Sequence, residues 1–556
     1  MTRTGRASFA QERFYFLNEL QPGNPAYVVA FALRLTGDLD PLALAAALHR
    51  VAKQHDVLRT CLAVVDGQLR QQVLDTAGPT IVVSSHDPAD RETQDRQLRE
   101  LVDAEARHPF DLTTGPVLRA RILSWADDQH ALVVLAHHVA CDGWAVGLLL
   151  DAIAAEYNTG TSPKPELSYL EYARAQRDAW SQNTKGLDHW RQVLAGAPQL
   201  ALHTDRPRPG VLSFRGRVLR QPVEPELIRG LTAWAKERGV TVFAIALAGY
   251  ATVLGSHARQ QEVVIGVPVA NRLEETEEGL VGCLVNTLPI RVDLSGHPSF
   301  PELVARTWRT ALTALSHQDV PFEQIVQALG EQRQLHHAPL FQTMLTVQNF
   351  TFTVPEFTGV KAEEVDVEIE ATKFDLGMTL DISTPAPFLR VEFSSDLFDE
   401  ATVAGMLTHY NTLLRSIVAD TDGEPTMVSA EERSLVTDGW NPPLLVTPPD
   451  HPSVLRSFLD HAERSPEAVA VRHRGQAVTY RELAAWSSRI AAALTDAGAG
   501  RGGRIGLLLG RSPAVIAAIL GVWKIGGVYV PLDPGYPRHR LDLIVDSAQP
   551  SLMVVD

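Results

Sequence analysis

Two adjacent histidines, His137 and His138, end an apolar run, and Asp142 and Gly143 follow at a short fixed spacing in the segment LAHHVACDGWAV. An imidazole titrates near neutral pH, so at the mouth of a buried strand it can take a proton from an amine during acyl transfer. Side chains on a strand alternate between its two faces, so only one of the two histidines can face a cavity while the strand persists. The segment therefore predicts one chemically active imidazole and one supporting imidazole.

Each of these residues also has a structural interpretation. A buried histidine is often a hydrogen-bonded core residue, and an Asp-Gly pair is often only a turn that the glycine permits. Adjacent histidines on a strand are poor co-ligands for zinc, and the three widely spaced cysteines, Cys61, Cys141 and Cys283, form no ligand cluster. We therefore expect no metal site.

The elements that position the motif can be read from the pattern around it. Ala131 to Ala136 is a continuous apolar run, which predicts a strand covered on both faces. Asp40 to Gln54 predicts a helix with Asp40 as N-cap and Pro41 as its first residue. Pro301 to Ser316 predicts a second amphipathic helix that begins with proline, and the proline-rich segment Asp205 to Gly210 predicts a break between two halves.

Size and composition limit the class of protein. A chain of 556 residues is too long for one compact core, so we expect two to four domains. The net charge of -16 has no basic block, which excludes nucleic acid and anionic membranes as favoured partners. Few and scattered cysteines and an N-terminus without a secretory signal predict a cytoplasmic protein. The longest apolar stretch, Ala514 to Leu532, is interrupted by Lys524 and Pro531 and predicts a buried helix followed by a strand.

The composition changes near residue 421. Residues 426–452 contain Pro442-Pro443 and Pro448-Pro449 and predict a semi-rigid linker. Residues 453–556 then begin a new α/β pattern. The chain thus divides into a long first region and a shorter second one.

The motif HHVACDGW resembles the HHxxxDG signature of the condensation domains of nonribosomal peptide synthetases, which are relatives of chloramphenicol acetyltransferase. Five more segments resemble motifs of this family in the family's order: Ser8 to Arg13 (SxAQxR), His55 to Thr60 (HExLRT), Tyr169 to Ala173 (YxDFA), Gly282 to Thr287 (GxFVNT) and His317 to Glu323 (HQDxPFE). Phe14-Tyr15 stands where the family usually has Leu-Trp, and Leu62 replaces a phenylalanine. These departures bear on substrate preference.

The resemblance implies an α/β fold of two chloramphenicol-acetyltransferase-like lobes in a V-shaped arrangement with a tunnel between them. The expected boundaries are 1–180 for the N-terminal lobe and 181–425 for the C-terminal lobe. A donor acyl thioester on the phosphopantetheine arm of one carrier protein would enter from one side and an acceptor aminoacyl thioester from the other. The acceptor amine would attack the donor carbonyl to form a peptide bond. The chain itself is expected to bind no cofactor.

The resemblance also assigns roles within the motif. His138 is expected to face the tunnel, either as general base or as a group that aligns the amine, and His137 to support it. Asp142 is expected to form an ion pair with Arg272 that holds the loop. Gly143 is either a turn glycine or a donor of its N–H toward the developing oxyanion.

Two further residues are candidates for the tunnel or for the segment that crosses between the lobes. Trp144 follows the motif directly, and Asn286 lies in the segment that the resemblance places across the lobes. The Asn286 side chain is expected to bind main-chain groups.

The second region resembles the N-terminal part of an adenylation domain. Val478 to Leu483 is similar to the first core motif of that family, and Val522 to Pro534, followed by Tyr536-Pro537, is similar to the second. No phosphate-binding loop rich in serine, threonine and glycine follows within the 556 residues, and no carrier-protein serine motif is present. We therefore expect no amino-acid activation by this chain and interpret the order as that of an elongation module.

Two other functions remain open at this point. One is a non-catalytic recruitment platform on the same fold, although such platforms usually lose the second histidine or the glycine, which are both present here. The other is an acyltransferase that forms esters or uses a fatty acyl donor. Because Met1 lies just before the first motif, we expect the donor carrier protein to act in trans. We also expect the chain to be a monomer.

Overall fold

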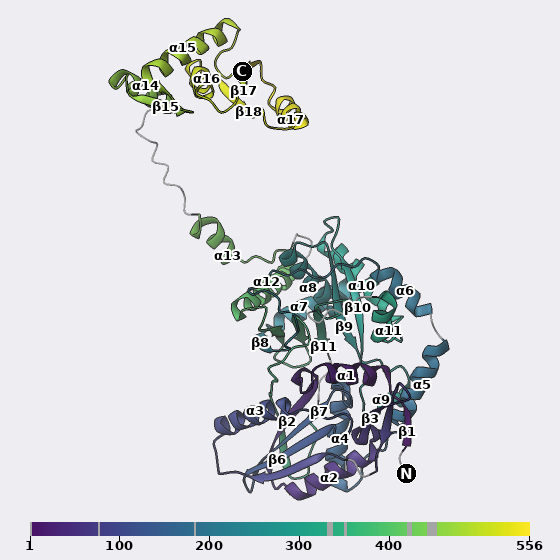
Figure 1. The fold of residues 1–556 in the computed structure, drawn as a ribbon. Helices are drawn as coiled ribbons and strands as arrows, with labels where there is room; N and C mark the ends of the chain where they lie inside the picture. The colour runs from purple at the N-terminus through teal and green to yellow at the C-terminus, as the bar shows by residue number, and fades with distance from the viewer. Residues whose placement is uncertain are drawn as a thin grey trace. The chain divides into compact units, whose positions relative to one another are not determined.

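The computed structural model describes residues 3–75, 78–182, 185–330, 337–349, 353–419, 425–441 and 453–556. The chain divides into two compact units, residues 1–433 and 434–556. The first unit has two lobes, each with its own hydrophobic core (Figure 1). The predicted linker, residues 426–452, lies partly outside the described residues, and its first part forms the short helix α13 (Ala430–Ser434) and the turn η3 (Leu435–Gly439).

The N-terminal lobe is built on a five-stranded sheet of order β12-β2-β7-β6-β5 and a three-stranded sheet of order β1-β4-β3. The strands are β1 (Arg3–Arg6), β2 (Val28–Gly37), β3 (Thr60–Val65), β4 (Gln68–Val73), β5 (Thr80–Ser85), β6 (Leu118–Ala126), β7 (Gln129–His137) and β12 (Val360–Val365). The helices and turns are α1 (Phe9–Leu20), η1 (Pro25–Tyr27), α2 (Pro41–Gln54), η2 (Asp56–Arg59), α3 (Arg91–Arg107), α4 (Gly143–Thr159) and α5 (Tyr169–Gln182).

The C-terminal lobe is built on a six-stranded sheet of order β10-β9-β11-β13-β14-β8. The strands are β8 (Gly216–Pro222), β9 (Glu262–Val269), β10 (Asn286–Asp293), β11 (Thr343–Gln348), β13 (Leu376–Asp381) and β14 (Phe388–Ser394). The helices are α6 (Lys185–Leu194), α7 (Pro225–Glu237), α8 (Val242–Ala258), α9 (Glu275–Glu278), α10 (Phe300–Leu315), α11 (Phe322–Leu329) and α12 (Glu400–Ala419). Helix α8 is apolar on all sides because it packs against strands β9 and β11 and against three helices.

Several sequence predictions are confirmed. Strand β7 contains the apolar run and lies between β2 and β6, and its residues from His130 to His137 are all buried. Asp40 is the N-cap of α2, where its carboxylate accepts the N–H groups of Leu42 and Ala43. Helix α10 begins one residue before the predicted start, because Ser299 and Glu302 form a capping box there.

The predicted range 181–425 for the C-terminal lobe contains two segments that join the N-terminal lobe instead. Strand β12 pairs antiparallel with β2 along the edge of the N-terminal sheet. Residues 280–285 also contribute to the N-terminal core, through Leu280, Val281, Cys283 and Leu284. The local sequence pattern does not show this, because β12 makes its hydrogen bonds and residues 280–285 bury their apolar side chains against partners far away in the sequence.

The second unit contains a β15–β16 hairpin and a parallel three-stranded sheet of order β18-β17-β19. Its elements are α14 (Val454–Arg464), β15 (Val469–His473), β16 (Gln476–Thr479), α15 (Tyr480–Asp496), β17 (Arg504–Leu508), α16 (Pro513–Lys524), β18 (Val528–Leu532), α17 (Arg538–Ala548) and β19 (Leu552–Val555). Thr479 and Glu482 form the capping box of α15, which explains the segment VTYREL as a strand end followed by a helix start. The predicted helix and strand within Ala514 to Leu532 are confirmed as α16 and β18.

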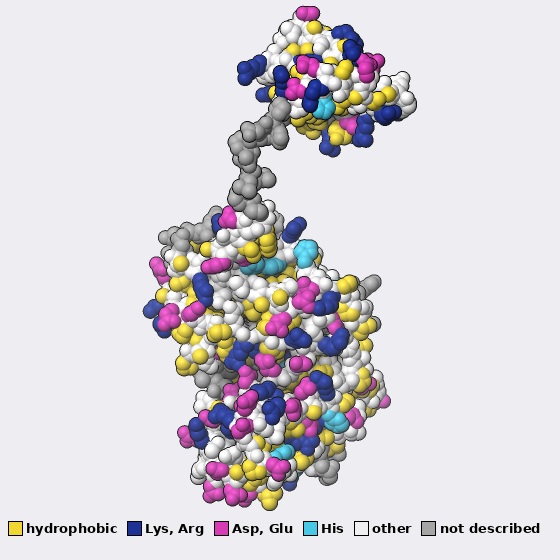
Figure 2. All heavy atoms as spheres, turned by 90° about the vertical axis from the view of Figure 1, so that its left-hand side faces the viewer, with side chains coloured by type: hydrophobic (Ala, Val, Ile, Leu, Met, Phe, Trp, Pro, Cys, Tyr) yellow, Lys and Arg dark blue, Asp and Glu magenta, His cyan; other side chains and the backbone are white. Residues whose placement is uncertain are grey.

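The surface carries both signs of charge interspersed, as the face of the first unit in Figure 2 shows. Among the described residues no single helix is both long and apolar enough to cross a membrane, and α7 with α8 meets that requirement only as a pair bent by 106°.

Candidate functional site

His138 is the first residue beyond strand β7. Its N–H donates to the main-chain oxygen of Tyr27 at 2.8 Å, which continues the pairing of β2 with β7 for one more residue. Its imidazole is stacked on the Phe14 ring of α1, with ring centres 5.1 Å apart and planes 17° apart. The Sγ atom of Cys283, from the segment that crosses between the lobes, lies 3.7 Å from Nδ1. The main chain of His138 is thus held by Tyr27, and its ring by Phe14 and Cys283.

Burial lowers the pKa of His138 well below its usual range. The positive charges of Lys373 and Arg13 act in the same direction, as does His137, while a hydrogen bond to its own main chain raises the pKa of His138. The imidazole is therefore neutral at physiological pH. In the tautomer that carries the hydrogen on Nδ1, Nε2 is the nitrogen that can accept a proton.

His137 lies in a different environment. Its Nδ1 accepts the N–H of Val139 at 3.1 Å, and its ring makes edge contacts with Phe14 and Phe110. Burial, followed by the charge of Lys373, lowers the pKa of His137 to about 3. This histidine is a neutral, hydrogen-bonded part of the core.

Asp142 is the N-cap of α4 and binds both lobes of the first unit. Oδ1 accepts the N–H of Ala145 at 2.9 Å and lies 3.3 Å from a guanidinium nitrogen of Arg272. Oδ2 accepts the N–H groups of Leu284 at 2.9 Å and Val285 at 3.2 Å. The ion pair that the resemblance implied is present, and both of its side chains are at least 96% buried.

Gly143 does not form a turn, so the first of its two expected roles is wrong. It is the first residue of α4 and does not have a positive φ. The turn between β7 and α4 is made instead by residues 138–140, with the Ala140 N–H donating to the His137 oxygen. A Cβ added at Gly143 would meet no atom within 4 Å, so open space lies beside the helix start.

Trp144 and Asn286 differ in their surroundings. Trp144 is 41% exposed, and its indole N–H donates to the oxygen of Glu278. Asn286 is buried at the start of β10, and its amide donates to the oxygens of Gln318 and Val320 at 2.8 and 2.7 Å. The amide oxygen accepts the N–H of Phe322 at 3.1 Å, so Asn286 binds the HQDVPFE segment to β10.

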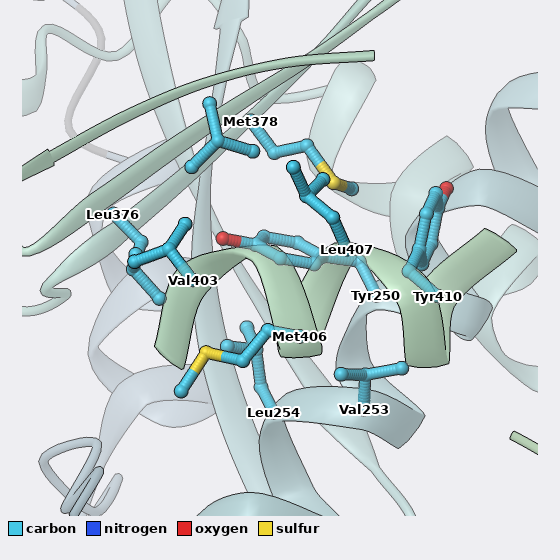
Figure 3. Close-up of a pocket in the computed structure, with 10 residues that line it drawn as sticks. Tyr250, Val253, Leu254, Leu376, Met378, Val403, Met406, Leu407 and Tyr410 are labelled. Atoms are coloured by element: carbon cyan, nitrogen blue, oxygen red, sulfur yellow. The ribbon is translucent and has the colours of Figure 1, made fainter. Parts of the chain in front are cut away.

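The cavity in Figure 3 is not part of this site. It has a volume of about 20 Å³, room for about one water molecule, and lies between α8, α12 and strands β13 and β14. Its lining is apolar apart from the two tyrosine hydroxyls, and these are hydrogen-bonded to Thr343 and to the oxygen of Ala246. It is a packing void of the C-terminal core.

Residues 2–436 match the family described as "Condensation domain", and residues 458–556 match the one described as "AMP-binding enzyme". The chain belongs to the condensation-domain family.

Curated relatives of this condensation domain are long synthetases. Malpinin synthetase of Mortierella alpina is 35% identical over 563 residues, which cover 99% of this chain and 7% of that protein. A linear gramicidin synthase of Brevibacillus parabrevis is 33% identical, over 98% of this chain and 11% of that protein. Bacitracin synthase 2 of Bacillus licheniformis is 31% identical, over 98% of this chain and 21% of that protein. The chain thus spans a small part of the length of these relatives.

Solved structures support the fold. A four-domain nonribosomal peptide synthetase bound to AMP and glycine has a TM-score of 0.72 at 23% identity, covering 100% of this chain and 44% of that chain. The condensation domain of the Monacolin K polyketide synthase MokA has a TM-score of 0.68 at 20% identity, covering 77% of this chain and 99% of that chain.

Three of the sequence motifs of the condensation domain meet beside the crossing segment. The Tyr169 hydroxyl donates to the oxygen of Cys283 at 2.8 Å and lies 3.0 Å from Oγ of Ser8. A Cβ on Gly282 would lie 2.2 Å from the Tyr169 ring, so only glycine fits there. By contrast, the HDVLRT motif makes its contacts inside the N-terminal lobe, where its own Arg59 pairs with its Asp56.

Sequence reasoning did not place any residue against the His138 ring. It noted Phe14 as a departure from the leucine that the family usually has, but related that departure to substrate preference and not to the imidazole. Arg13, which lies 4.7 Å from the Phe14 ring centre and pairs with Glu323 at 3.1 Å, joins the first motif to the last. Lys373 gave no signal, because its approach to the site depends on the folding of the opposite lobe.

Asp142→Ala is expected to destabilise the condensation unit by about 3–5 kcal/mol, because it leaves the buried Arg272 guanidinium without its charge partner. Urea unfolding of the full chain measures this change in the transition of that unit. Asp188→Ala is the matched control, since it breaks an ion pair with Arg191 whose side chains are 75% and 51% exposed, and it should cost less than about 1 kcal/mol. Equal free energies of unfolding for the two variants would contradict a stabilising role of the buried Asp142–Arg272 ion pair.

Proposed function

We propose that the condensation domain forms a peptide bond between a donor aminoacyl or peptidyl thioester and an acceptor aminoacyl thioester, both carried on phosphopantetheine arms of carrier proteins. The observation that carries the proposal is the His138 imidazole, which is neutral, stacked on Phe14 and placed where the two lobes meet. The named relatives, which include synthases of gramicidin and bacitracin, support a place in nonribosomal peptide biosynthesis.

The reaction requires a neutral amine and a place for its proton. The acceptor nitrogen attacks the donor carbonyl carbon, which forms the C–N bond and moves the π electron pair to oxygen. His138 Nε2 holds the amine by a hydrogen bond and takes its proton as the nitrogen becomes positive. Collapse of the intermediate returns the electron pair, breaks the C–S bond and releases a thiolate, which takes the proton from the imidazolium.

The other residues of the motif position this imidazole. His137 fills the core below it, and the Asp142–Arg272 pair fixes the loop and the start of α4. On either side of the crossing segment, Trp144 donates to the main-chain oxygen of Glu278 and Asn286 donates to that of Val320. A protein that only recruits partners has no need for a neutral imidazole in this setting, so catalysis is the function that we favour.

Both thioesters would arrive on carrier proteins, so the phosphopantetheine belongs to the substrates and not to this chain. Delivery of the donor in trans, a monomeric state and a cytoplasmic location stay predictions from the sequence.

His138→Ala is expected to slow dipeptide formation by about 10²–10⁴-fold, the usual range for loss of a general acid–base group. Donor and acceptor carrier proteins loaded with a panel of amino acids are mixed with the full chain, and dipeptidyl thioester is measured by mass spectrometry. His86→Ala, at an exposed histidine of the same lobe, is the control and should leave the rate unchanged. Equal rates for His138→Ala and wild type would refute the catalytic role.

Phe14→Leu is expected to slow the reaction by up to about tenfold, since aromatic stacking contributes about 0.5–1.5 kcal/mol and fixes the imidazole plane. Phe9→Leu is the matched control, because Phe9 lies on the same helix, is equally buried at 3% exposure and also lies under a guanidinium, that of Arg177. Rate constants with saturating carriers compare the two variants. An equal fall of the rate constant in Phe14→Leu and Phe9→Leu would show that the stacking of Phe14 on His138 has no catalytic effect.

A further inference from the structure

Lys373 brings a positive charge to His138 from the opposite lobe. It lies in the segment between β12 and β13, whereas His138 follows β7. Its Nζ atom is 5.6 Å from the ring centre of Tyr27, the residue whose main-chain oxygen binds the N–H of His138. The charge of Lys373 also acts on the His138 imidazole itself, so both residues share the surroundings of Tyr27.

Lys373 forms no ion pair with a carboxylate within the described parts of the chain. Glu392, whose charge acts on Lys373, is itself paired with Arg390. Arg13 is the other lysine or arginine whose charge acts on His138, and it is already paired with Glu323 at 3.1 Å. Burial lowers the pKa of Lys373, because removing a cation from water without a partner is costly. An anionic ligand beside Nζ would favour the charged form, so Lys373 is the cation that a ligand can neutralise.

Tyr27 does not replace the missing carboxylate. Burial raises the pKa of Tyr27 to about 12, so its hydroxyl is neutral at physiological pH. The distance of 5.6 Å from Nζ to the ring centre is close to the limit of about 6 Å for a cation–π contact. The ring supports the lysine side chain but neutralises little of its charge.

The segment that carries Lys373 is fixed on both sides. The Thr372 N–H donates to the oxygen of Phe214 at 3.0 Å. The Asp375 carboxylate accepts two hydrogen bonds from the Arg208 guanidinium. The main chain on both sides of Lys373 is thus held in place before any substrate arrives, and a preorganised frame of this kind favours electrostatic catalysis.

We propose that the Lys373 ammonium stabilises the negative charge that develops on the donor carbonyl oxygen when the acceptor amine attacks at His138. The inference rests on the proposed condensation reaction and names a further catalytic residue for it. The electron pair that leaves the carbonyl double bond is held as an oxyanion beside Nζ. It returns to the carbonyl when the C–S bond breaks, so Lys373 neither gains nor loses a proton.

The test uses the full chain and the donor–acceptor pair of loaded carrier proteins that wild type converts fastest. Single-turnover rates are measured for Lys373→Met, which removes the charge, and Lys373→Arg, which keeps it. Lys361→Met is the matched control, since Lys361 is on β12, 72% exposed and paired with Glu363. Thermal unfolding of each variant shows that it is folded.

Lys373→Met is expected to lower the rate constant of the chemical step by about 10²–10³-fold, the usual effect of removing one donor to an oxyanion. The concentration of donor carrier at half-maximal rate should change by less than about threefold, because the charge acts on the transition state. Lys373→Arg should be at least tenfold faster than Lys373→Met, and Lys361→Met should have the wild-type rate constant.

The pH dependence supplies a second readout that a purely structural lysine would not change. Lys373, Arg13, His137 and Cys283 are the titratable or charged groups that face His138 in the described chain. Loss of the Lys373 charge lets the pKa of His138 rise, so the acid limb of kcat/KM should move to higher pH in Lys373→Met. The contribution of the free amine is the same in both proteins.

A Lys373→Met rate within threefold of wild type overturns this inference. An equal fall of the rate constant in Lys373→Met and Lys373→Arg also overturns it. The shape of the side chain would then determine the rate, and its charge would not. Product formation by wild type supports the proposed condensation in either case, so the two failures are distinguishable.

Discussion

The Asp142 carboxylate is the constraint on which the site depends. It accepts hydrogen bonds from the start of α4, from the guanidinium of Arg272 and from two successive N–H groups of the crossing segment, Leu284 and Val285. One buried charge therefore fixes the loop after β7 relative to the segment that carries Cys283. Because Cys283 faces Nδ1 of His138, the same carboxylate sets the position of the imidazole through its neighbours.

The electrostatics of the site follow from this packing. Burial and the nearby charges of Lys373 and Arg13 keep the imidazole neutral, so it is ready to accept a proton when an amine arrives. The same charges disfavour a protonated amine beside His138 and favour negative charge on a carbonyl oxygen. The Phe14 ring of α1 covers one face of the imidazole and itself packs against the Tyr27 ring of η1.

The sequence predicted what depends on neighbours in the chain. The N-cap Asp40, the buried strand β7 and the proline-started helix α10 follow from local pattern, and the ordered motifs gave the family and the Asp142–Arg272 pair. The sequence did not predict features set by distant partners. A turn was one of the two roles expected for Gly143, but Asp142 caps a helix that begins at Gly143. The pairing of β12 with β2 and the effect of the Lys373 charge on His138 join segments more than two hundred residues apart.

The most direct test of the central claim is a crystal structure of the full chain with a stable amide mimic of the joined donor and acceptor arms. If His138 accepts the proton of the amine, the new amide nitrogen lies about 2.6–3.2 Å from Nε2 of His138, the distance of a hydrogen bond that can transfer a proton. A mimic bound between the lobes with its amide out of reach of His138 would show that this imidazole does not act on the amine.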